Sequence, residues 1–173
     1  MRPVRVVVAA LAIGLAGVAA GCGSEIGDSC STSDDCNAGT TSGGRACDPG
    51  GGGYCTIIGC DYDSCPSEAT CVRFFTGSFQ NRTCNPQKED LPASDGTDDC
   101  SADELCELDG HCVTRTSELR YCMRTCSDNS DCRDGFECRD LALMKAHGGE
   151  PVPEPGTRLG DNPQRFCAVA PSN

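Results

Sequence analysis

The sequence predicts a small disulfide-rich fold. We expect tandem cysteine-rich modules with short antiparallel β-hairpins and loops, and little helix apart from an N-terminal signal peptide. Cysteine accounts for 17 of the 173 residues, and tryptophan is absent. The 152 residues after position 21 contain only 24 large apolar side chains. Burying each contributes roughly 1.5 to 3 kcal/mol, whereas ordering the chain costs about 1.5 kcal/mol per residue. Disulfides, rather than a conventional core, must therefore provide the main support.

The first 21 residues have the pattern of a removable signal peptide. Met1 to Arg5 carries two arginines, and Val6 to Ala20 is a run of 15 residues without a charged side chain. A permanent membrane helix needs roughly 20 apolar residues. We therefore expect this shorter segment to direct export and then to be cleaved off.

The residues at the expected cleavage site, Val18-Ala19-Ala20-Gly21-Cys22, resemble the lipobox of bacterial lipoproteins. In that family the cysteine is diacylglycerated and, after cleavage, becomes the acylated N-terminus. The resemblance implies a lipid on Cys22, a tether over residues 22–29 and a membrane partner. Gly23 stands where an Asp often retains such proteins in the inner membrane, so we expect an outer-membrane or cell-surface location. The alternative is an ordinary secretory signal that leaves Cys22 as a free or paired thiol.

Cysteine parity favours lipidation, because the 16 other cysteines can pair completely. They recur at nearly constant spacing, commonly with five residues between them. We expect eight disulfides, mostly within four sets in chain order, and leave the connectivity inside each set open. The sets are Cys30, Cys36, Cys47 and Cys55; Cys60, Cys65, Cys71 and Cys84; Cys100, Cys106, Cys112 and Cys122; and Cys126, Cys132, Cys138 and Cys167.

Two cysteine segments, Ser31 to Cys36 and Ser127 to Cys138, resemble the Ser-Asp-Cys repeats of cysteine-rich bacterial surface and secreted proteins. They are also loosely similar to Dickkopf-type disulfide modules. The resemblance implies tandem small modules. We place one pair of modules at 30–84 and a second pair at 100–173. The linker between them, 85–99, is rich in charged and turn-forming residues.

Secondary structure is expected in short pieces. Strands are predicted at 71–75, 111–115 and 120–124. A two-turn helix is predicted at 141–147, inside a long excursion between Arg139 and Arg165 that we expect to be loosely packed.

The net charge of −12 becomes −14 once Arg2 and Arg5 are removed. Without a basic cluster, nucleic acid is excluded as an expected partner. No CxxC pair is present, which argues against zinc and against a thioredoxin-like catalyst. We expect no cofactor and no metal. Two groups of acidic residues are considered as calcium ligands, and we interpret them instead as turn caps. The groups are Asp98, Asp99, Asp103 and Glu104, and Asp128, Asn129, Asp131 and Asp134.

A catalytic base has no evident support, because neither His111 nor His147 lies in a context that would orient it. We therefore expect a non-enzymatic, lipid-anchored surface protein that presents binding or structural modules, with an extracellular or envelope protein as partner. The candidate interface residues are Phe74, Phe75 and Tyr121, since exposed aromatic side chains commonly anchor interfaces.

The alternative function is that of a secreted or surface-bound protease inhibitor. Its candidate reactive segments are Arg73-Phe74-Phe75 and Arg120-Tyr121.

Phe136 is expected to lie in a small core, whereas the place of Phe79 is left open.

Overall fold

The computed structural model describes residues 24–38, 44–76, 82–88, 99–160 and 162–171. Within these ranges it contains short strands, three 3₁₀ turns and two helices. The helices are α1 (Ser33–Asn37) and α2 (Leu141–His147). The strands are β1 (Ala46–Asp48), β2 (Tyr54–Thr56), β3 (Ala69–Phe75), β4 (Glu104–Cys106), β5 (Cys112–Thr114), β6 (Glu118–Arg124), β7 (Phe136–Arg139), β8 (Glu150–Pro151) and β9 (Phe166–Val169).

These elements confirm the predicted fold class, since all strand pairs are antiparallel and helix is scarce. β3, β5 and β6 lie where strands were predicted, and α2 covers 141–147. α2 begins after Asp140, whose carboxylate accepts hydrogen bonds from the backbone N–H groups of Ala142 and Leu143, both at 3.0 Å. It ends at Gly148, which has a positive φ of 78°. Both are common helix boundaries.

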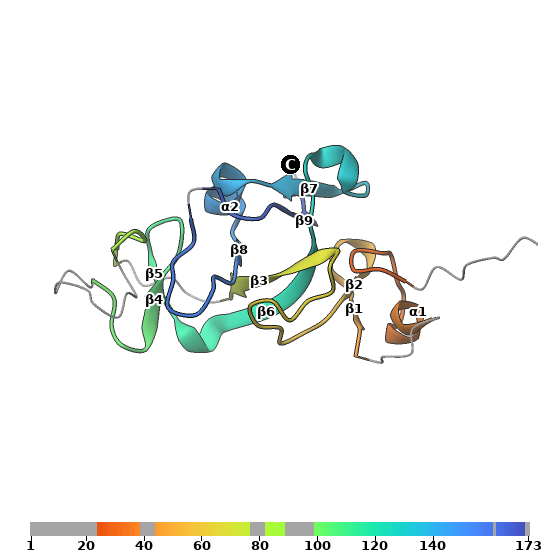
Figure 1. Ribbon diagram of the computed structural model, residues 1–173, viewed down its shortest axis with the longest axis horizontal. Coiled ribbons are helices and arrows are strands. Elements are labelled where there is room, and N and C mark those ends of the chain that lie inside the picture. The colour runs from red at the N-terminus through yellow and green to blue at the C-terminus, as the bar shows by residue number, and fades with distance from the viewer. Residues whose placement is uncertain (1–23, 39–43, 77–81, 89–98, 161, 172–173) are drawn as a thin grey trace, which may run out of the picture.

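The largest sheet has the strand order β6-β3-β8. β3 pairs with β6 along its full length, from Ala69 opposite Arg124 to Phe75 opposite Glu118. The pairs β1–β2, β4–β5 and β7–β9 form three small two-stranded sheets. Figure 1 shows α1 towards one end of the long axis and β4 and β5 at the other. Because β3 precedes residues 85–99 and β6 follows them, the two predicted module pairs share one sheet.

Eight disulfides pair all 16 described cysteines, as the parity argument predicted. Each of four antiparallel strand pairs holds two cysteines directly opposite each other in register: Cys47 and Cys55, Cys71 and Cys122, Cys106 and Cys112, and Cys138 and Cys167. Each of these bonds to a cysteine earlier in the chain. The bonds are Cys30–Cys47, Cys36–Cys55, Cys60–Cys71, Cys65–Cys122, Cys84–Cys106, Cys100–Cys112, Cys126–Cys138 and Cys132–Cys167.

Two of these bonds correct the expected division of the cysteines. Cys84 and Cys122 exchange sets, so that Cys65–Cys122 and Cys84–Cys106 both connect the two sides of the predicted linker. The cause is the pairing of β3 with β6, which places Cys122 opposite Cys71 and makes the β4–β5 hairpin an insertion between the two strands. Most of the linker, residues 89–98, lies outside the described residues.

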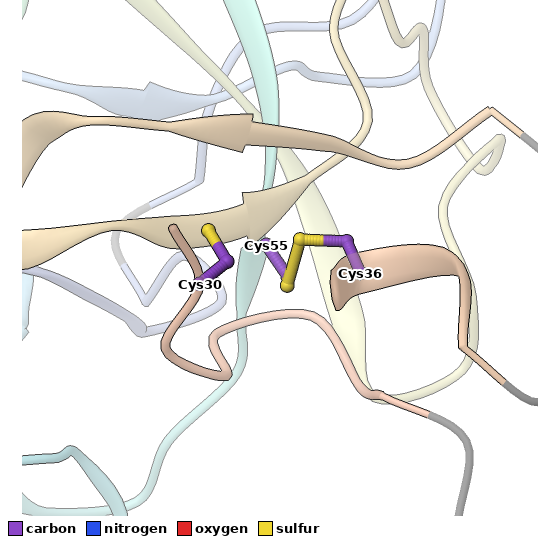
Figure 2. Close-up of side chains that lie close together, drawn as sticks. All are labelled: Cys30, Cys36 and Cys55. Carbon is purple, nitrogen blue, oxygen red and sulfur yellow. A yellow bond between two sulfur atoms is a disulfide. The ribbon is translucent and has the colours of Figure 1, made fainter. Parts of the chain in front are cut away.

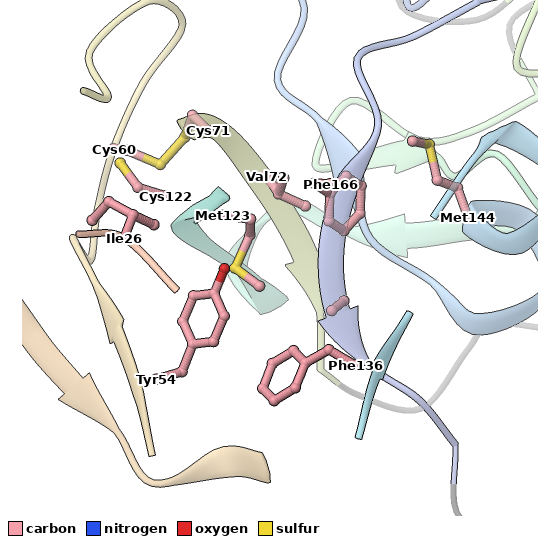
Figure 3. Packing of buried hydrophobic residues seen from close by; sticks show 11 residues of the cluster. Ile26, Tyr54, Cys60, Cys71, Val72, Cys122, Met123, Phe136, Met144 and Phe166 are labelled. Atoms are coloured by element: carbon pink, nitrogen blue, oxygen red, sulfur yellow. A yellow bond between two sulfur atoms is a disulfide. The ribbon is translucent and has the colours of Figure 1, made fainter. Parts of the chain in front are cut away.

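The main core combines cystine with a few large side chains (Figure 3). Its buried members are Ile26, Tyr54, Cys60, Cys71, Val72, Cys122, Met123, Phe136, Met144, Phe166 and Ala168. Half-cystines thus occupy core positions where larger domains use aliphatic residues.

The N-terminal segment differs from the expected tether. Ile26 is fully buried. The N–H of Gly27 donates to the carbonyl of Cys55, and the N–H of Cys55 donates to the carbonyl of Asp28, both at 2.9 Å. From Ser24 onward, the predicted 22–29 tether is therefore packed against the body.

The first half of the excursion between Arg139 and Arg165 is packed rather than loose, whereas most of the described residues from 154 to 165 are exposed. Met144 of α2 is only 2% exposed, and β8 adds a third strand to the central sheet. The Arg139 guanidinium donates to the carbonyl oxygens of His147, Gly148 and Val169 at 2.7 to 2.9 Å. These contacts hold the C-terminal end of α2 onto the β7–β9 pair.

We predict that the Cys65–Cys122 bond contributes more stability than Cys100–Cys112. It spans 57 residues rather than 12, and a longer closed loop restricts the unfolded chain more strongly. Replacing Cys65 and Cys122 together by Ala should lower the free energy of unfolding about 1 kcal/mol more than the same change at Cys100 and Cys112. Denaturant unfolding measures the difference, and non-reducing peptide mapping checks the pairing. An equal effect of the two double substitutions would contradict this prediction.

Candidate functional site

A cleft of about 400 Å³ lies between α2, the end of β3 and the turn that joins β4 to β5. Three segments far apart in sequence contribute its walls. The lining residues are Phe74, Phe75, Glu107, Leu108, Asp109, Met144, Lys145, Ala146, His147, Gly148, Gly149 and Glu150. Two of the predicted interface residues, Phe74 and Phe75, are therefore on this surface, together with acidic residues that the sequence did not single out.

A buried ion pair holds these segments together. Arg73 of β3 contacts a carboxylate oxygen of Glu150 in β8 through Nη2 at 2.5 Å and through Nε at 2.6 Å. The Glu150 side chain is only 4% exposed. The same carboxylate accepts a hydrogen bond from the backbone N–H of Leu108, in the β4–β5 turn. One carboxylate thus connects β3, β8 and the inserted hairpin.

Burial raises the pKa of two carboxyl groups that line the cleft, Glu150, where the Arg73 charge opposes the shift, and Glu107. Partial burial raises the pKa of Glu107 to about 7, and the negative charges of Asp109 and Glu150 act in the same direction. Arg73 opposes the shift. Near neutral pH, Glu107 is therefore divided between its protonated and ionised forms, so that the charge of the cleft responds to pH.

Phe74 packs on two other rings. Its centroid lies 6.1 Å from that of Tyr121 and 6.2 Å from that of Phe166, both in edge-on geometry. The Arg73 guanidinium lies 5.7 Å from the centroid of the Phe75 ring. Phe74 is consequently a supporting wall, with Phe75 beside it at the cleft.

Tyr121, the third predicted interface residue, does not line this cleft. With Phe74 it lines a second, smaller pocket of about 170 Å³, whose other residues are Asp48, Gly50, Tyr54, Thr56, Met123, Phe136 and Val169. Phe136 is buried and stacks on Tyr54 with centroids 5.3 Å apart, as expected for a core residue. Phe79 lies outside the described residues.

Both histidines have carboxylate neighbours that the sequence analysis missed. Nδ1 of His147 lies 2.7 Å from Oε1 of Glu137, and Nδ1 of His111 lies 3.1 Å from Oδ2 of Asp109. His147 faces the cleft, and none of the described residues that line it is Ser, Thr or Cys. Within the described part of the chain, the cleft therefore orients an imidazole without a hydroxyl or thiol beside it for nucleophilic attack.

The cysteines form close groups that superficially resemble metal sites. Figure 2 shows Cys30, Cys36 and Cys55, whose sulfur atoms lie within 4.8 Å of one another. The grouping arises because two disulfides lie side by side, and a bonded sulfur is not the thiolate that zinc requires. The same holds for three further groups: Cys60, Cys65 and Cys71; Cys84, Cys100 and Cys106; and Cys126, Cys132 and Cys138.

The acidic group after Cys126 caps turns. The Asp131 carboxylate accepts backbone hydrogen bonds from Ser127 and Asp128, and that of Asp128 accepts from Ser130. Hydrogen bonds from Ser130 lower the pKa of Asp128. Asp35 caps α1 in the same way, since backbone hydrogen bonds from Ser31 and Thr32 lower its pKa. Of the first acidic group, Asp98 lies outside the described residues.

No protein-family model matches the chain, and no curated protein or solved structure is significantly similar to it. The eight disulfides are typical of an exported or extracellular protein. In the described part of the chain, no helix has the length and apolar character needed to cross a membrane.

We predict that the cleft depends on glycine at position 149. A Cβ there would lie 2.5 Å from Cε1 of Phe74, whereas a Cβ at Gly148 would meet no atom within 4 Å. Both glycines have φ near +78°, so Ala is strained at either site. Gly149→Ala should therefore lower the free energy of unfolding about 1 to 3 kcal/mol more than Gly148→Ala, the additional effect being overpacking. If denaturant unfolding shows that both variants lose the same free energy of unfolding, the Phe74 ring moves aside for the added Cβ at no cost, and the prediction is wrong.

We also predict a pH-dependent penalty at Glu107. The folded chain retains this proton up to about pH 7, whereas the usual pKa is 4.5. Between these values the folded state binds more protons, so this group lowers stability as pH rises through that range. Glu107→Gln removes this loss of stability. The melting temperature of the variant minus that of wild type should therefore increase by a few degrees between pH 4.5 and pH 8.

The matched control is Glu154→Gln, at an exposed position, which should give a constant difference over this pH range. If the melting temperatures of Glu107→Gln and wild type differ by the same amount at every pH, the raised pKa is contradicted.

Proposed function

We propose that this chain is an exported, non-enzymatic lipoprotein, anchored through acylated Cys22 at the outer membrane or cell surface. Its disulfide-stapled body binds an extracellular or envelope protein. The observation that carries the anchor is the complete pairing of the other 16 cysteines, which leaves Cys22 no disulfide partner within the chain. That unmatched cysteine directly follows the segment that resembles a lipobox.

The cleft between α2 and the β4–β5 turn is the surface proposed for binding. It combines the Phe75 ring with the partly buried carboxyl group of Glu107, and so offers both apolar contact and charge. Clefts that combine apolar walls with a few polar groups are the usual form of a binding site. Phe74 supports the cleft from behind, since it packs on Phe166 and Tyr121.

The protease-inhibitor alternative gains no support at its two candidate segments. Arg73 lies in the central strand β3 and pairs with buried Glu150. Arg120 lies in β6 and pairs with Glu118 and Asp61 at 2.5 and 2.7 Å. An inhibitory loop presents an exposed, extended backbone to the protease, whereas these two arginines lie in paired strands.

Intact-mass analysis tests the anchor. The chain produced in a bacterium and extracted with detergent should begin at Cys22 and carry lipid-sized additions, because the thiol and the new amino group are both acylated. Cys22→Ala should lose every acyl addition, whereas Gly23→Ala should retain them. A water-soluble wild-type chain with an unmodified Cys22 would exclude the lipid anchor.

A further inference from the structure

The attachment of the N-terminal segment to the body limits how far any anchor at Cys22 can lie from the folded chain. Ile26 is fully buried among core residues. Glu25 forms an ion pair with Arg124 at 3.1 Å, and the Ser24 hydroxyl donates to the carbonyl of Asp35 at 2.6 Å. Residues from several elements therefore hold the chain from Ser24 onward.

Only Gly23 separates Cys22 from this fixed segment. Each residue spans at most about 3.6 Å, so the Cα atoms of Cys22 and Ser24 lie within about 7 Å of each other in any conformation. Two or more acyl chains on Cys22 would hold that residue at the bilayer surface. The body then has no free linker on which to move away from the membrane or to turn over.

We propose that the end of the body around Ser24 and α1 docks on the phospholipid headgroups, and that the β4–β5 end points away from the membrane. This placement rests on the proposed lipidation of Cys22. Figure 1 shows α1 and the β4–β5 hairpin at opposite ends of the long axis. The cleft, which includes Glu107 and Asp109 of the β4–β5 turn, is thereby presented outward.

Charge favours this end-on placement over one in which the body lies flat. The chain after residue 21 has a net charge of −14, and bacterial surfaces rich in anionic lipid repel such a body within a Debye length. The docking end is itself acidic, since α1 carries Asp34 and Asp35, and Arg124 and Arg45 there pair with Glu25 and Glu68. An end-on body nevertheless brings fewer acidic side chains to the headgroups than a body that lies flat.

Energy transfer to acceptors on the lipid headgroups measures this orientation. The donor is a fluorophore attached by click chemistry to azidophenylalanine. This residue replaces either Asp34, in α1 at the docking end, or Asp103, next to β4; both positions are exposed. The vesicles contain phosphatidylcholine and phosphatidylglycerol. Transfer from position 34 should exceed transfer from position 103 at least about twofold, because a body of this size is on the order of 40 Å across. Equal transfer from the two positions would overturn the docking proposal.

Two changes test the short connection. Inserting 20 Gly and Ser residues between Gly23 and Ser24 adds about 25 Å of flexible chain and should abolish the difference between the positions. Ile26→Ser should weaken it, whereas Ile58→Ser, at a residue 57% exposed, should not. If Ile26→Ser fails to fold, the insertion alone tests whether the short connection sets the orientation. A difference that survives the insertion would show that the short connection does not set the orientation.

A second means of attachment separates this proposal from natural lipidation. The chain from Cys22 onward has its other 16 cysteines paired, so its Cys22 thiol can be coupled to a maleimide phospholipid in the vesicles. Equal transfer from the two positions of this coupled chain would overturn the orientation alone. Absence of acyl mass on the native chain would instead overturn the lipid anchor.

Discussion

The structure depends on one constraint, the register that places two cysteines directly opposite each other on neighbouring antiparallel strands. Such residues have Cα atoms only about 4.5 to 5.5 Å apart. Because each bonds to a different cysteine earlier in the chain, two disulfides lie side by side. In the β1–β2, β3–β6 and β7–β9 pairs, they fix both strands to the same preceding segment. Strands of two to seven residues, which would be marginal alone, persist because covalent bonds do most of what a core does in a larger domain.

The disulfides hold the strand pairs, but other contacts orient the pairs relative to one another. The Arg133 guanidinium donates to the carbonyl oxygens of Gly51 and Gly53 and lies 4.2 Å from the centroid of the Phe136 ring, joining the first and last strand pairs. At the other end, Arg73 and Glu150 connect the central sheet to the inserted hairpin. Removing one partner of such a buried pair would leave an uncompensated charge, so both residues are required where apolar side chains are few.

Local features were predictable from sequence, and long-range pairings were not. The α2 helix lies at its predicted position, bounded by Asp140 and Gly148, and β3, β5 and β6 lie at the three predicted strands. The exchange of Cys84 and Cys122 between the cysteine sets could not be predicted from spacing. It depends on the pairing of β3 with β6, which are separated in sequence by the inserted hairpin. The cleft depends on the same pairing, since it brings Phe75 close to Glu107. Ile26 gave a usable signal, as a large apolar residue within an otherwise polar segment.

The covalent framework also bears on how the cleft could bind. One wall belongs to the β4–β5 hairpin, which Cys84–Cys106 and Cys100–Cys112 fix. The other wall is α2, which follows β7 and is held to the β7–β9 pair by Arg139. Both walls are thus in place before a partner arrives, and a preorganised surface loses less conformational entropy on binding. A chain with so few apolar side chains has little apolar surface to bury against a partner, so the binding proposed for this cleft depends on a low entropic cost of association.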